Sequence, residues 1–353
     1  MENKKVAVVS LKFSPGHISH LIAFYKLFFS LYSEVFLLLD EKYKKYLKDE
    51  NIENIIYYST DKDIYNYDIY LFQNPSILNH KFANKINKNS YIIYNFHEPW
   101  DGIKKYLKES FKNSLKMYGA HYYNKKMLKA SNKILVPSQY ALKMYKKYDF
   151  KYNNNVSFFP LIFDDECGIN KIKNTKKEYF SFIGTATKNR NISKFIDFCT
   201  YANKKNSNLK FLIYSRRKVD DYNINKIQNL INKGIVKVKH GKPLTNEEIN
   251  EGYLKSYAVW NNYSRSTQSG VLAKAMMFGT ASLASNIGSF KEFINNNYNG
   301  FVLERGTNEE ILKKIDLIIE DNNIKTNCRN YFMDNFYYKN QINLMKGLIS
   351  KNA

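Results

Sequence analysis

Short apolar runs alternate with amphipathic segments along the first half of the chain. The apolar runs cover residues 6–11, 35–40, 55–58, 69–73, 91–96 and 133–138, and a run at 156–163 closes this half. An amphipathic helix is predicted after the first run, from Ile18 to Tyr32. Short apolar strands separated by helices are typical of a parallel sheet covered on both faces.

The same pattern restarts after a polar, charged stretch at 164–178, which is predicted to be an interdomain linker. Five further strands are predicted, at 179–184, 209–215, 235–241, 257–263 and 280–285. The sequence therefore predicts an α/β protein with two doubly wound domains in tandem, 1–163 and 164–334. The amphipathic segment 335–353 is expected to pack back on the first domain. Strand carboxyl ends hold the ligands of such sheets, so a cleft between the domains is the expected binding site.

Composition limits the classes of protein to consider. The chain has 353 residues, with 44% hydrophobic and 16% aromatic side chains, which suits two globular domains. No apolar run approaches the roughly 20 residues of a membrane-spanning helix. The first residues lack the layout of a signal peptide, so we expect a cytoplasmic protein. The three cysteines, Cys167, Cys199 and Cys328, are far apart, which argues against disulfides or a zinc site.

The net charge of +23 calls for an anionic partner or a bias in amino-acid usage. Basic residues are spread along the whole chain and form no clustered nucleic-acid motif. A membrane surface or phosphorylated substrates therefore fit the charge better than a specific duplex. The Tyr- and Lys-rich segment 104–129 could lie on an anionic membrane, and a solvated helix face is the equal alternative.

Residues 264–278, SRSTQSGVLAKAMMF, place small hydrogen-bonding side chains ahead of a predicted helix. The backbone amides of Ser269, Gly270 and Val271 would then form the start of that helix. A helix start carries partial positive charge and exposed donors, which suits a phosphate group. Taken alone, the same pattern also fits a close-packed turn without a ligand.

A longer series of residues makes the pattern more specific. The series is Tyr263, Thr267, Gln268, Ser269, Gly270, Val271, Phe278, Gly279, Gly288, Glu292, Asn299 and Gly300. It resembles the nucleotide-sugar site of retaining glycosyltransferases of family 4, which have the GT-B fold of two facing Rossmann-like domains. The resemblance implies that residues 263 and 267–271 of this series bind the sugar donor. It extends over essentially the whole chain and is sharpest from about 235 to 303.

One departure from the family concerns two glutamates separated by seven residues, the second of which contacts the nucleotide ribose in many members. Ser266 and Lys274 occupy the two places here, so both carboxylates are missing. Lys274 could pair with a phosphate or a uronate of the donor, or could be solvated. We favour a solvated lysine.

The turn after the strand at 179–184 adds two cations. Gly184, Thr185, Lys188 and Arg190 precede a predicted helix, where the resemblance implies an Arg and a Lys that bind the donor diphosphate. Such cations would stabilise the charge on a departing diphosphate. Solvated side chains are the alternative, particularly for Lys188. Two weaker candidates for nucleotide contact lie at the end of the strand at 209–215, namely Ser215 and Arg216.

In the first domain, NFHEPWDG follows the strand at 91–96. His97 could contact the transferred sugar, and Glu98 or Asp101 could accept a proton from the acceptor. A capping or packing role is the alternative for this group.

Two further parts of the first domain are assigned to the acceptor side. Trp100 belongs to the same loop, and Ser14, Gly16 and His17 belong to the first loop, where the family has a flexible glycine loop. His17 and His20 are expected to be surface or packing residues. No Asp-x-Asp run lies at the end of a predicted strand, so no metal site and no cofactor are expected, and protein cations and amides would neutralise the diphosphate.

The resemblance implies a metal-independent transferase that moves a sugar from a nucleotide diphosphate sugar to a saccharide or lipid-linked acceptor, with retention. Lipopolysaccharide, capsule and exopolysaccharide are the expected kinds of product. One alternative is a degenerate GT-B-like protein, or an epimerase relative, that binds a nucleotide sugar without transferring it. A basic nucleic-acid-binding protein is a further alternative. A dehydrogenase is disfavoured because residues 6–20 lack the spaced glycines of a dinucleotide site.

Overall fold

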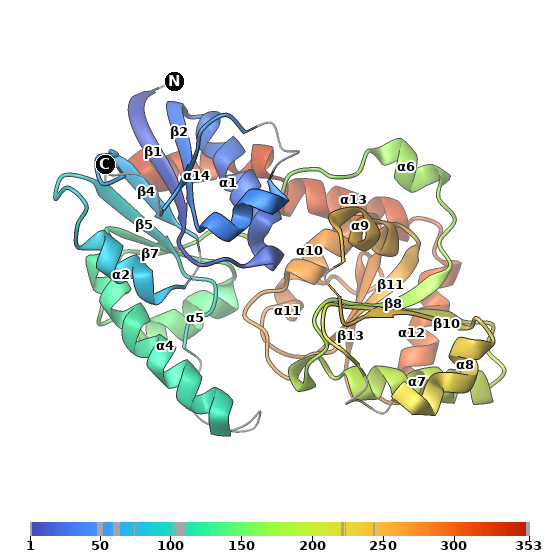
Figure 1. The fold of residues 1–353 in the computed structure, drawn as a ribbon. Coiled ribbons are helices and arrows are strands. Elements are labelled where there is room, and N and C mark those ends of the chain that lie inside the picture. The colour runs from blue at the N-terminus through green and yellow to red at the C-terminus, as the bar shows by residue number, and fades with distance from the viewer. Residues whose placement is uncertain are drawn as a thin grey trace. The chain divides into compact units, whose positions relative to one another are not determined.

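The computed structural model describes residues 2–47, 52–58, 64–73, 75–100, 102, 111–219, 222, 224–242 and 244–350. The chain divides into two compact units, one made of residues 1–164 and 335–353 and the other of residues 165–334 (Figure 1). Each unit contains one parallel sheet with helices on it, so the predicted tandem α/β architecture is confirmed. None of the described helices is long and apolar enough to span a bilayer.

The first unit is built on a seven-stranded parallel sheet in the order β3-β2-β1-β4-β5-β6-β7. Its strands are β1 (Glu2–Ser10), β2 (Tyr32–Leu39), β3 (Ile55–Tyr57), β4 (Ile69–Phe72), β5 (Tyr91–Asn95), β6 (Lys133–Val136) and β7 (Val156–Phe158). The register places Val6 of β1 beside Val35 on one side and Ile69 on the other. The strand order reverses between β1 and β4, which is where doubly wound sheets bind ligands.

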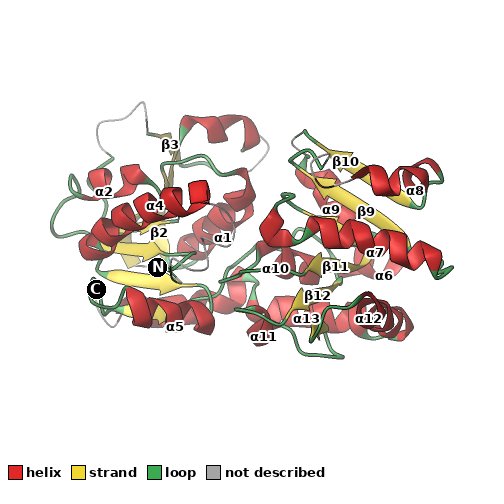
Figure 2. Cartoon of the chain, turned by 90° about the horizontal axis from the view of Figure 1, so that it is seen from below, coloured by secondary structure: helices red, strands yellow, loops and turns green. Residues whose placement is uncertain are grey.

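Helices cover both faces of this sheet because alternate residues of each strand are buried on opposite sides. The helical elements are η1 (Pro15–His17), α1 (Ile18–Phe29), η2 (Glu41–Tyr46), α2 (Ile77–Ala83), α4 (Phe111–Ala130) and α5 (Gln139–Tyr148). Val6 and Val8 of β1 belong to one core cluster with α1, whereas Ala7 and Val9 belong to a second cluster with α2, α4 and α5. Figures 1 and 2 both show α2 beside α4.

The end of the chain belongs to the first unit. It forms η6 (Tyr338–Gln341) and α14 (Ile342–Ser350). Phe163 pairs with Tyr337 in a parallel bridge, and Met345 and Ile349 are buried in the core cluster that contains α1. The face of the sheet that α1 covers is thereby completed by residues from both ends of the sequence.

The second unit has a six-stranded parallel sheet in the order β10-β9-β8-β11-β12-β13. Its strands are β8 (Tyr179–Ile183), β9 (Lys210–Ser215), β10 (Val236–His240), β11 (Ser256–Asn261), β12 (Ala281–Ser285) and β13 (Gly300–Leu303). Every residue of β8 and β11 is buried, as expected for central strands covered on both faces. The strand order reverses between these two neighbours.

Most of the described helices of the second unit are short. They are α6 (Ile169–Asn174), η3 (Lys188–Arg190), α7 (Ile192–Lys204), η5 (Ile224–Ile227), α8 (Gln228–Asn232), α9 (Asn246–Leu254), α10 (Gly270–Met277), α11 (Phe290–Phe293), α12 (Asn308–Glu320) and α13 (Ile324–Asn335). Helix α9 packs on β8, β9 and β11, and α10 packs on β11 and β12.

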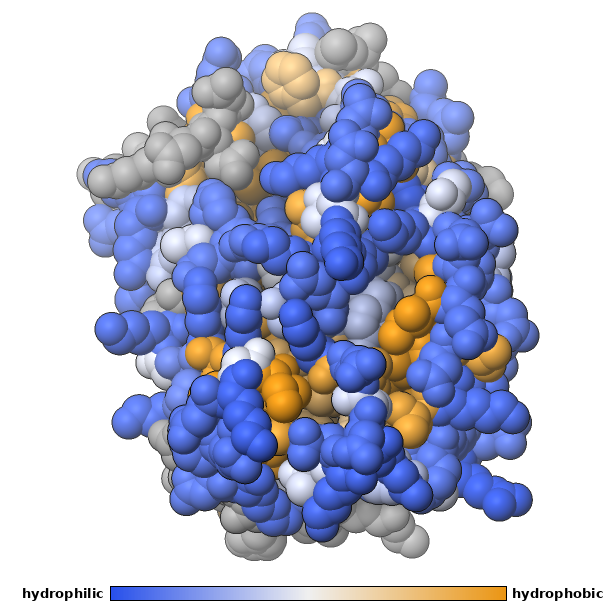
Figure 3. Space-filling model, turned by 90° about the vertical axis from the view of Figure 1, so that its right-hand side faces the viewer, coloured by the Kyte–Doolittle hydropathy of each residue, from blue (hydrophilic) through white to orange (hydrophobic). Residues whose placement is uncertain are grey.

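Hydrophilic side chains cover most of the face of the protein seen in Figure 3.

Candidate active site

The strand reversal in the second unit brings together the turn after β8 and the segment after β11. Gly184 follows β8 with φ of +126°, a backbone conformation that favours glycine. A Cβ atom at Gly184 would lie only 2.0 Å from Arg190 Nη1. The guanidinium therefore lies directly over the Gly184 backbone, and the absent side chain is what makes room for it.

Arg190 is held by residues of β11 and of the segment after it. Its guanidinium carbon lies 5.1 Å from the centre of the Tyr263 ring, and Trp260 Nε1 donates a hydrogen bond to its carbonyl oxygen at 3.1 Å. The Nη1 atom is buried, and none of the described residues accepts a hydrogen bond from it. A buried guanidinium donor without an acceptor is costly unless a ligand binds it.

The segment between Tyr263 and α10 supplies further donors. Ser266, Thr267 and Ser269 are all at least 90% buried. Gln268 Oε1 accepts a hydrogen bond from the Ser269 amide at 3.1 Å, whereas Gln268 Nε2 is buried and has no acceptor among the described residues. Gly270 and Val271 follow as the first turn of α10.

The turn after β12 packs against this segment. A Cβ atom at Gly288 would lie 1.9 Å from the carbonyl oxygen of Ser266, so only glycine permits the contact. The hydroxyls of Ser266 and Ser289 are buried without a hydrogen-bond partner among the described residues. A guanidinium, a primary amide, two hydroxyls and a helix start thus gather at the carboxyl edge of β8, β11 and β12. Such a set of donors suits an anion with several oxygen atoms, such as a diphosphate.

Three of the predicted donor-site cations, Arg190, Arg216 and Lys188, occupy different environments. Burial and Tyr263 raise the pKa of Tyr253, and Arg190 and then Arg216 lower it, so both arginines lie within electrostatic range of this ring. Lys188 is exposed at the start of η3. Of these three cations, Arg190 is the one that contacts with Gly184, Trp260 and Tyr263 hold in place. Direct contact of Lys188 and Arg216 with a donor remains a prediction.

Ser215 has hydrogen bonds within the protein. Its hydroxyl accepts from the amides of Ala186 and Arg217 and donates to the carbonyl of Arg217 at 2.8 Å. These bonds tie the turn after β8, including the neighbouring Thr185, to the turn after β9. Contact of Ser215 or Thr185 with a donor remains a prediction.

The expectation of a solvated Lys274 is wrong. Its side chain is only 11% exposed, and Nζ forms an ion pair of 3.0 Å with Glu166 Oε2. Asn250 Nδ2 of α9 donates to the same oxygen at 2.8 Å. A carboxylate from the segment before α6 therefore reaches α10 beside the place where the family has a glutamate on the helix itself. Sequence reasoning missed Glu166 because nothing in the local pattern links it to α10.

In the first unit, His97 follows β5 and is buried. Its Nε2 atom accepts hydrogen bonds from Gln73 Nε2 at 3.1 Å and, at 3.4 Å, from Asn95 Nδ2. Burial, with the nearby His17 and His20, holds the pKa of His97 well below its usual value. His97 is thus a neutral imidazole. Its partner Gln73 directly follows β4, and its partner Asn95 is the last residue of β5. Because both residues lie at the carboxyl ends of predicted strands, the sequence pattern could have identified them as neighbours of His97.

His17 and His20 pack around His97. The ring centres lie 5.1 Å apart for His17 and His97, and 6.1 Å apart for His20 and His97. His20 Nδ1 donates to the carbonyl of Ile162 at 2.8 Å, and its ring lies against Phe163. The expectation that His20 is a packing residue is therefore confirmed. No group of three described His, Cys, Asp or Glu side chains is placed to hold a metal ion.

The other predicted site residues of the first unit have different surroundings. Ser14 and Gly16 belong to the turn between β1 and α1, where the amide of Ser14 donates to the Tyr43 hydroxyl at 3.0 Å. Glu98 is exposed. The Trp100 ring stacks on the His121 ring, with 4.6 Å between the ring centres. Asp101 lies outside the described residues.

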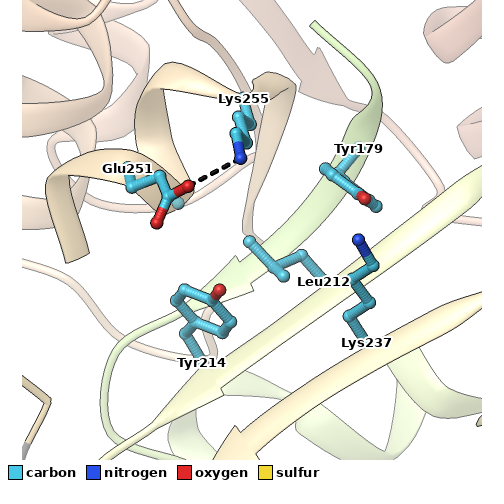
Figure 4. Close-up of a pocket in the computed structure, with 7 residues that line it drawn as sticks. Tyr179, Leu212, Tyr214, Lys237, Glu251 and Lys255 are labelled. Carbon is cyan, nitrogen blue, oxygen red and sulfur yellow. Dashed lines mark hydrogen bonds and ion pairs between the residues drawn. The ribbon is translucent and has the colours of Figure 1, made fainter. Parts of the chain in front are cut away.

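A shallow pocket of about 50 Å³ occupies another part of the second unit (Figure 4). Figure 4 shows it between α9 and the sheet, with Glu251 and Lys255 of the helix paired at 2.6 Å above Leu212, Tyr214 and Lys237 of the strands. None of its lining residues is a predicted site residue. The candidate active site is therefore the carboxyl edge of the sheet and not this pocket.

Comparison with known proteins fits this placement. Residues 169–333, nearly the whole second unit, match the family model of glycosyl transferases group 1. No curated protein sequence matches the chain. The structure resembles that of the Anabaena HepE protein in complex with UDP-glucose, with a TM-score of 0.72 and 13% identity over 99% of this chain and 100% of that one.

Two other solved structures are similar over their whole length. Sucrose-phosphate synthase from Thermosynechococcus elongatus has a TM-score of 0.72 and 12% identity, with 99% of both chains covered. WaaG, a glycosyltransferase of lipopolysaccharide biosynthesis, has a TM-score of 0.64 and 12% identity over 98% of this chain and 99% of WaaG. Identities this low show the fold, which is GT-B. Together with the family match, the fold indicates a glycosyltransferase.

The family match falls on the unit that holds Arg190 and the start of α10. The first unit, with His97, lies outside the matched range. Assignment of the GT-B fold to the first unit therefore depends on structural likeness, whereas the second unit is supported by sequence as well.

Proposed function

We propose that the protein transfers a sugar from a nucleotide diphosphate sugar to a saccharide or lipid-linked saccharide acceptor, with retention at the anomeric carbon. The observation that carries this proposal is the unpaired, buried Nη1 of Arg190 over Gly184, beside the start of α10. In the proposed reaction, the bond between the anomeric carbon and the diphosphate oxygen breaks. The acceptor oxygen bonds to the same carbon, and its proton leaves with the diphosphate.

The residues of the second unit would act on the leaving group. Arg190 and the amides of Gly270 and Val271 would bind the two phosphates through charge-assisted hydrogen bonds. Their interaction strengthens as negative charge builds up on the departing oxygen, and this difference lowers the barrier. Tyr263, packed beneath the guanidinium, would keep Arg190 in place. Protein cations would thereby supply the charge that a metal ion supplies in other transferases.

The first unit would bind the acceptor and contact the transferred sugar. His97, held neutral by burial, is suited to hydrogen bonds with uncharged hydroxyl groups. The solved HepE structure contains UDP-glucose, which supports a UDP-sugar as the first donor to test. WaaG acts in lipopolysaccharide biosynthesis, which supports a surface glycan as the first class of product to test.

The test combines binding with turnover. Thermal shifts with UDP-, GDP- and dTDP-sugars identify the best donor, and radiolabelled donor then reports transfer to glycan acceptors. We expect Arg190→Ala to weaken donor binding and to lower kcat/KM about a hundredfold. Arg305→Ala is the matched control, since Arg305 is exposed in the turn after β13.

Three outcomes decide between the candidate functions. Unchanged donor binding in Arg190→Ala would disprove the donor assignment. Donor binding without turnover, over a panel of glycan acceptors, would favour a degenerate nucleotide-sugar-binding protein. Isomerisation of the sugar on its nucleotide would favour an epimerase relative.

A further inference from the structure

Asp149 has one unsatisfied carboxylate oxygen inside the first unit. This residue ends α5, where its amide donates to the carbonyl of Tyr145 at 2.8 Å, and its side chain is fully buried. None of the described residues forms a hydrogen bond with its Oδ1 atom. A buried carboxylate oxygen without a donor lowers the stability of the fold, so a role outside folding is expected for Asp149.

A histidine ring of α4 faces this oxygen. His121 Nε2 lies 3.8 Å from Asp149 Oδ1, and the His121 side chain is only 9% exposed. The helix predicted at 104–129 is described from Phe111 onward, which includes His121. The distance between the two atoms is longer than that of a hydrogen bond. One proton added to either group would turn the pair into a donor and an acceptor.

Asp149 and His121 hold the same neighbour, Trp100. The second carboxylate oxygen, Asp149 Oδ2, accepts a hydrogen bond from the Trp100 amide at 3.4 Å. The Trp100 ring stacks on the His121 ring with 20° between the two planes. Trp100 lies in the loop after β5, three residues beyond His97. The backbone and the ring of Trp100 are therefore held by two helices that are distant from it in the sequence.

Burial decides which member of the pair takes up a proton first. Burial raises the pKa of Asp149 to about 6, although the Trp100 amide, Lys125 and Lys151 lower it. Burial, together with Lys125, lowers the pKa of His121 to about 4. As the pH falls through about 6, Asp149 is therefore protonated while His121 is still neutral. The new O–H group can donate to His121 Nε2, which is then an acceptor.

Two tyrosines complete the surroundings of the carboxylate. Burial, and then the charge of Asp149, raise the pKa values of Tyr94 of β5 and Tyr145 of α5, so both hydroxyls keep their protons. Tyr94 donates its proton to Asn124 Oδ1 at 3.1 Å, and Tyr145 donates to a backbone carbonyl at 2.9 Å. Neither tyrosine satisfies Asp149 Oδ1, and His121 is the group that can.

We propose that Asp149 and His121 are positioning residues for the saccharide acceptor, and that they hold the Trp100 ring in place for contact with a sugar ring. This proposal rests on the proposed function, in which the loop after β5 binds the acceptor. An indole ring offers an apolar face to the C–H groups of a sugar. Such a contact depends on where the indole lies. His121 supports the ring, and Asp149 fixes the backbone that carries it.

Tryptophan fluorescence tests these contacts without any need for transferase activity. The chain has two tryptophans, so Trp260→Phe leaves Trp100 as the only reporter. Proton uptake by Asp149 changes the contacts of the indole, and its emission should change with a midpoint near pH 6. In Asp149→Asn the side chain can accept from the Trp100 amide and donate to His121 at every pH, so this transition should disappear.

Asp321→Asn is the matched control for the titration. Asp321 ends α12 of the second unit as Asp149 ends α5, and its Oδ1 atom accepts from the amide of Asn323 at 2.8 Å. In the Trp260→Phe background, the Asp321→Asn variant should keep the emission transition near pH 6.

Kinetics with a saccharide acceptor test the role of the pair. Asp149→Leu removes the hydrogen-bond acceptor of the Trp100 amide and leaves an apolar side chain of similar volume, so the unit should fold. We expect the KM for the acceptor to rise about tenfold, whereas kcat and the affinity for UDP should change less than about twofold. His121→Ala removes the support of the indole and should raise the KM by a similar factor.

Conservative variants of the same residues should restore acceptor binding. Asp149→Asn keeps an acceptor for the Trp100 amide, and His121→Phe keeps a ring against the indole. Both variants should stay within about threefold of the native KM for the acceptor. A merely structural role would not separate these variants from Asp149→Leu and His121→Ala once all four fold.

Two results would overturn the proposal. The first is an emission transition that is absent, or that persists in Asp149→Asn. The second is a native KM for the acceptor in both Asp149→Leu and His121→Ala, while the protein still transfers sugar. Failure of the proposed function looks different, because the native protein would then show no turnover, or Arg190→Ala would bind the donor normally. Absence of turnover would overturn the acceptor role as well, whatever the emission of Trp100 shows.

Discussion

The carboxyl edges of the two sheets differ in the chemistry that they present at the same topological position. In the second unit, Arg190 and the start of α10 provide positive charge and hydrogen-bond donors, several of them unpaired. In the first unit, His97 is a neutral imidazole that accepts hydrogen bonds from Gln73 and Asn95. One fold thus places cationic and hydrogen-bond donor groups at this edge in one unit and an uncharged polar group in the other, which is the combination that the proposed charged donor and neutral acceptor would need.

The largest expected effect comes from filling the space at Gly184. In Gly184→Ala the new Cβ atom would occupy the position of Arg190 Nη1, and φ of +126° would strain the turn. The guanidinium can swing away, so the unit should fold while kcat/KM falls about a hundredfold or more. Initial rates with labelled donor measure the loss.

A second glycine separates the effect of backbone strain from the effect of displacing the Arg190 guanidinium. Gly234 also has a positive φ, of +71°, but a Cβ atom there would meet no atom within 4 Å. Gly234→Ala should lower the free energy of unfolding by about 1 kcal/mol and leave kcat/KM unchanged. Equal activity of the two variants would contradict the assignment of Arg190 to the anion site.

The next largest effect is on stability, and it concerns Lys177 at the carboxyl end of α10, opposite the proposed anion site. Lys177 Nζ donates to the carbonyls of Leu254, Ser256 and Phe278 at 3.2, 2.9 and 3.0 Å, and to Thr280 Oγ1 at 2.8 Å. Burial lowers the pKa of the Lys177 amine to about 7, and removal of the amine leaves several acceptors without a donor. Lys177→Met should lower the free energy of unfolding by about 3 kcal/mol, measured by urea denaturation.

Lys176 is the matched control because it is the exposed neighbour of Lys177. Lys176→Met should change the free energy of unfolding by less than about 0.5 kcal/mol. A similar loss in both variants would mean that the bonds of Lys177 do not hold α9 and α10 in place.

The sequence predicted most of this architecture and only part of the site. Long apolar strands such as β1 and β8 were predicted because their pattern is local. Strand β13 was missed, since its four residues follow Asn299 and were interpreted as a motif and not as a strand. The six residues of α6 were assigned to a linker because they span too few turns to show a helical period.

Within the site, features that depend on neighbouring residues in the sequence were predicted, whereas contacts between distant residues were missed. The start of α10 was predicted from adjacent small residues. The pairing of Lys274 with Glu166 was not, because the two residues meet only after folding and charged side chains occur on many exposed helices. Buried donors such as Ser289 were missed for the same reason, since burial depends on the packing of separate turns.

The ion pair of Lys274 offers a smaller test. In Glu166→Gln the amide oxygen can still accept from Asn250, but the negative charge beside Lys274 is lost. A site for anions should then bind UDP about threefold more tightly at low salt, because one neighbouring carboxylate no longer repels the phosphates. Isothermal titration measures this change. Weaker binding of both UDP and uridine would instead show that Glu166 contacts the nucleoside.

The smallest expected effect is on the pH dependence of the first unit. The pKa of His97 is lower in the folded protein than in the unfolded chain because burial disfavours the imidazolium. Below about pH 6.5 the unfolded chain therefore binds one more proton at this position, and the free energy of unfolding falls as the pH is lowered. His97→Gln should weaken that dependence, whereas His80→Gln, at a half-buried histidine of α2, should change it less. Urea denaturation at pH 7.5, 6.5 and 5.5 measures both slopes. Parallel slopes in the native protein and His97→Gln would mean that His97 accepts a proton in the folded state, and the neutral edge proposed for the first unit would then carry charge.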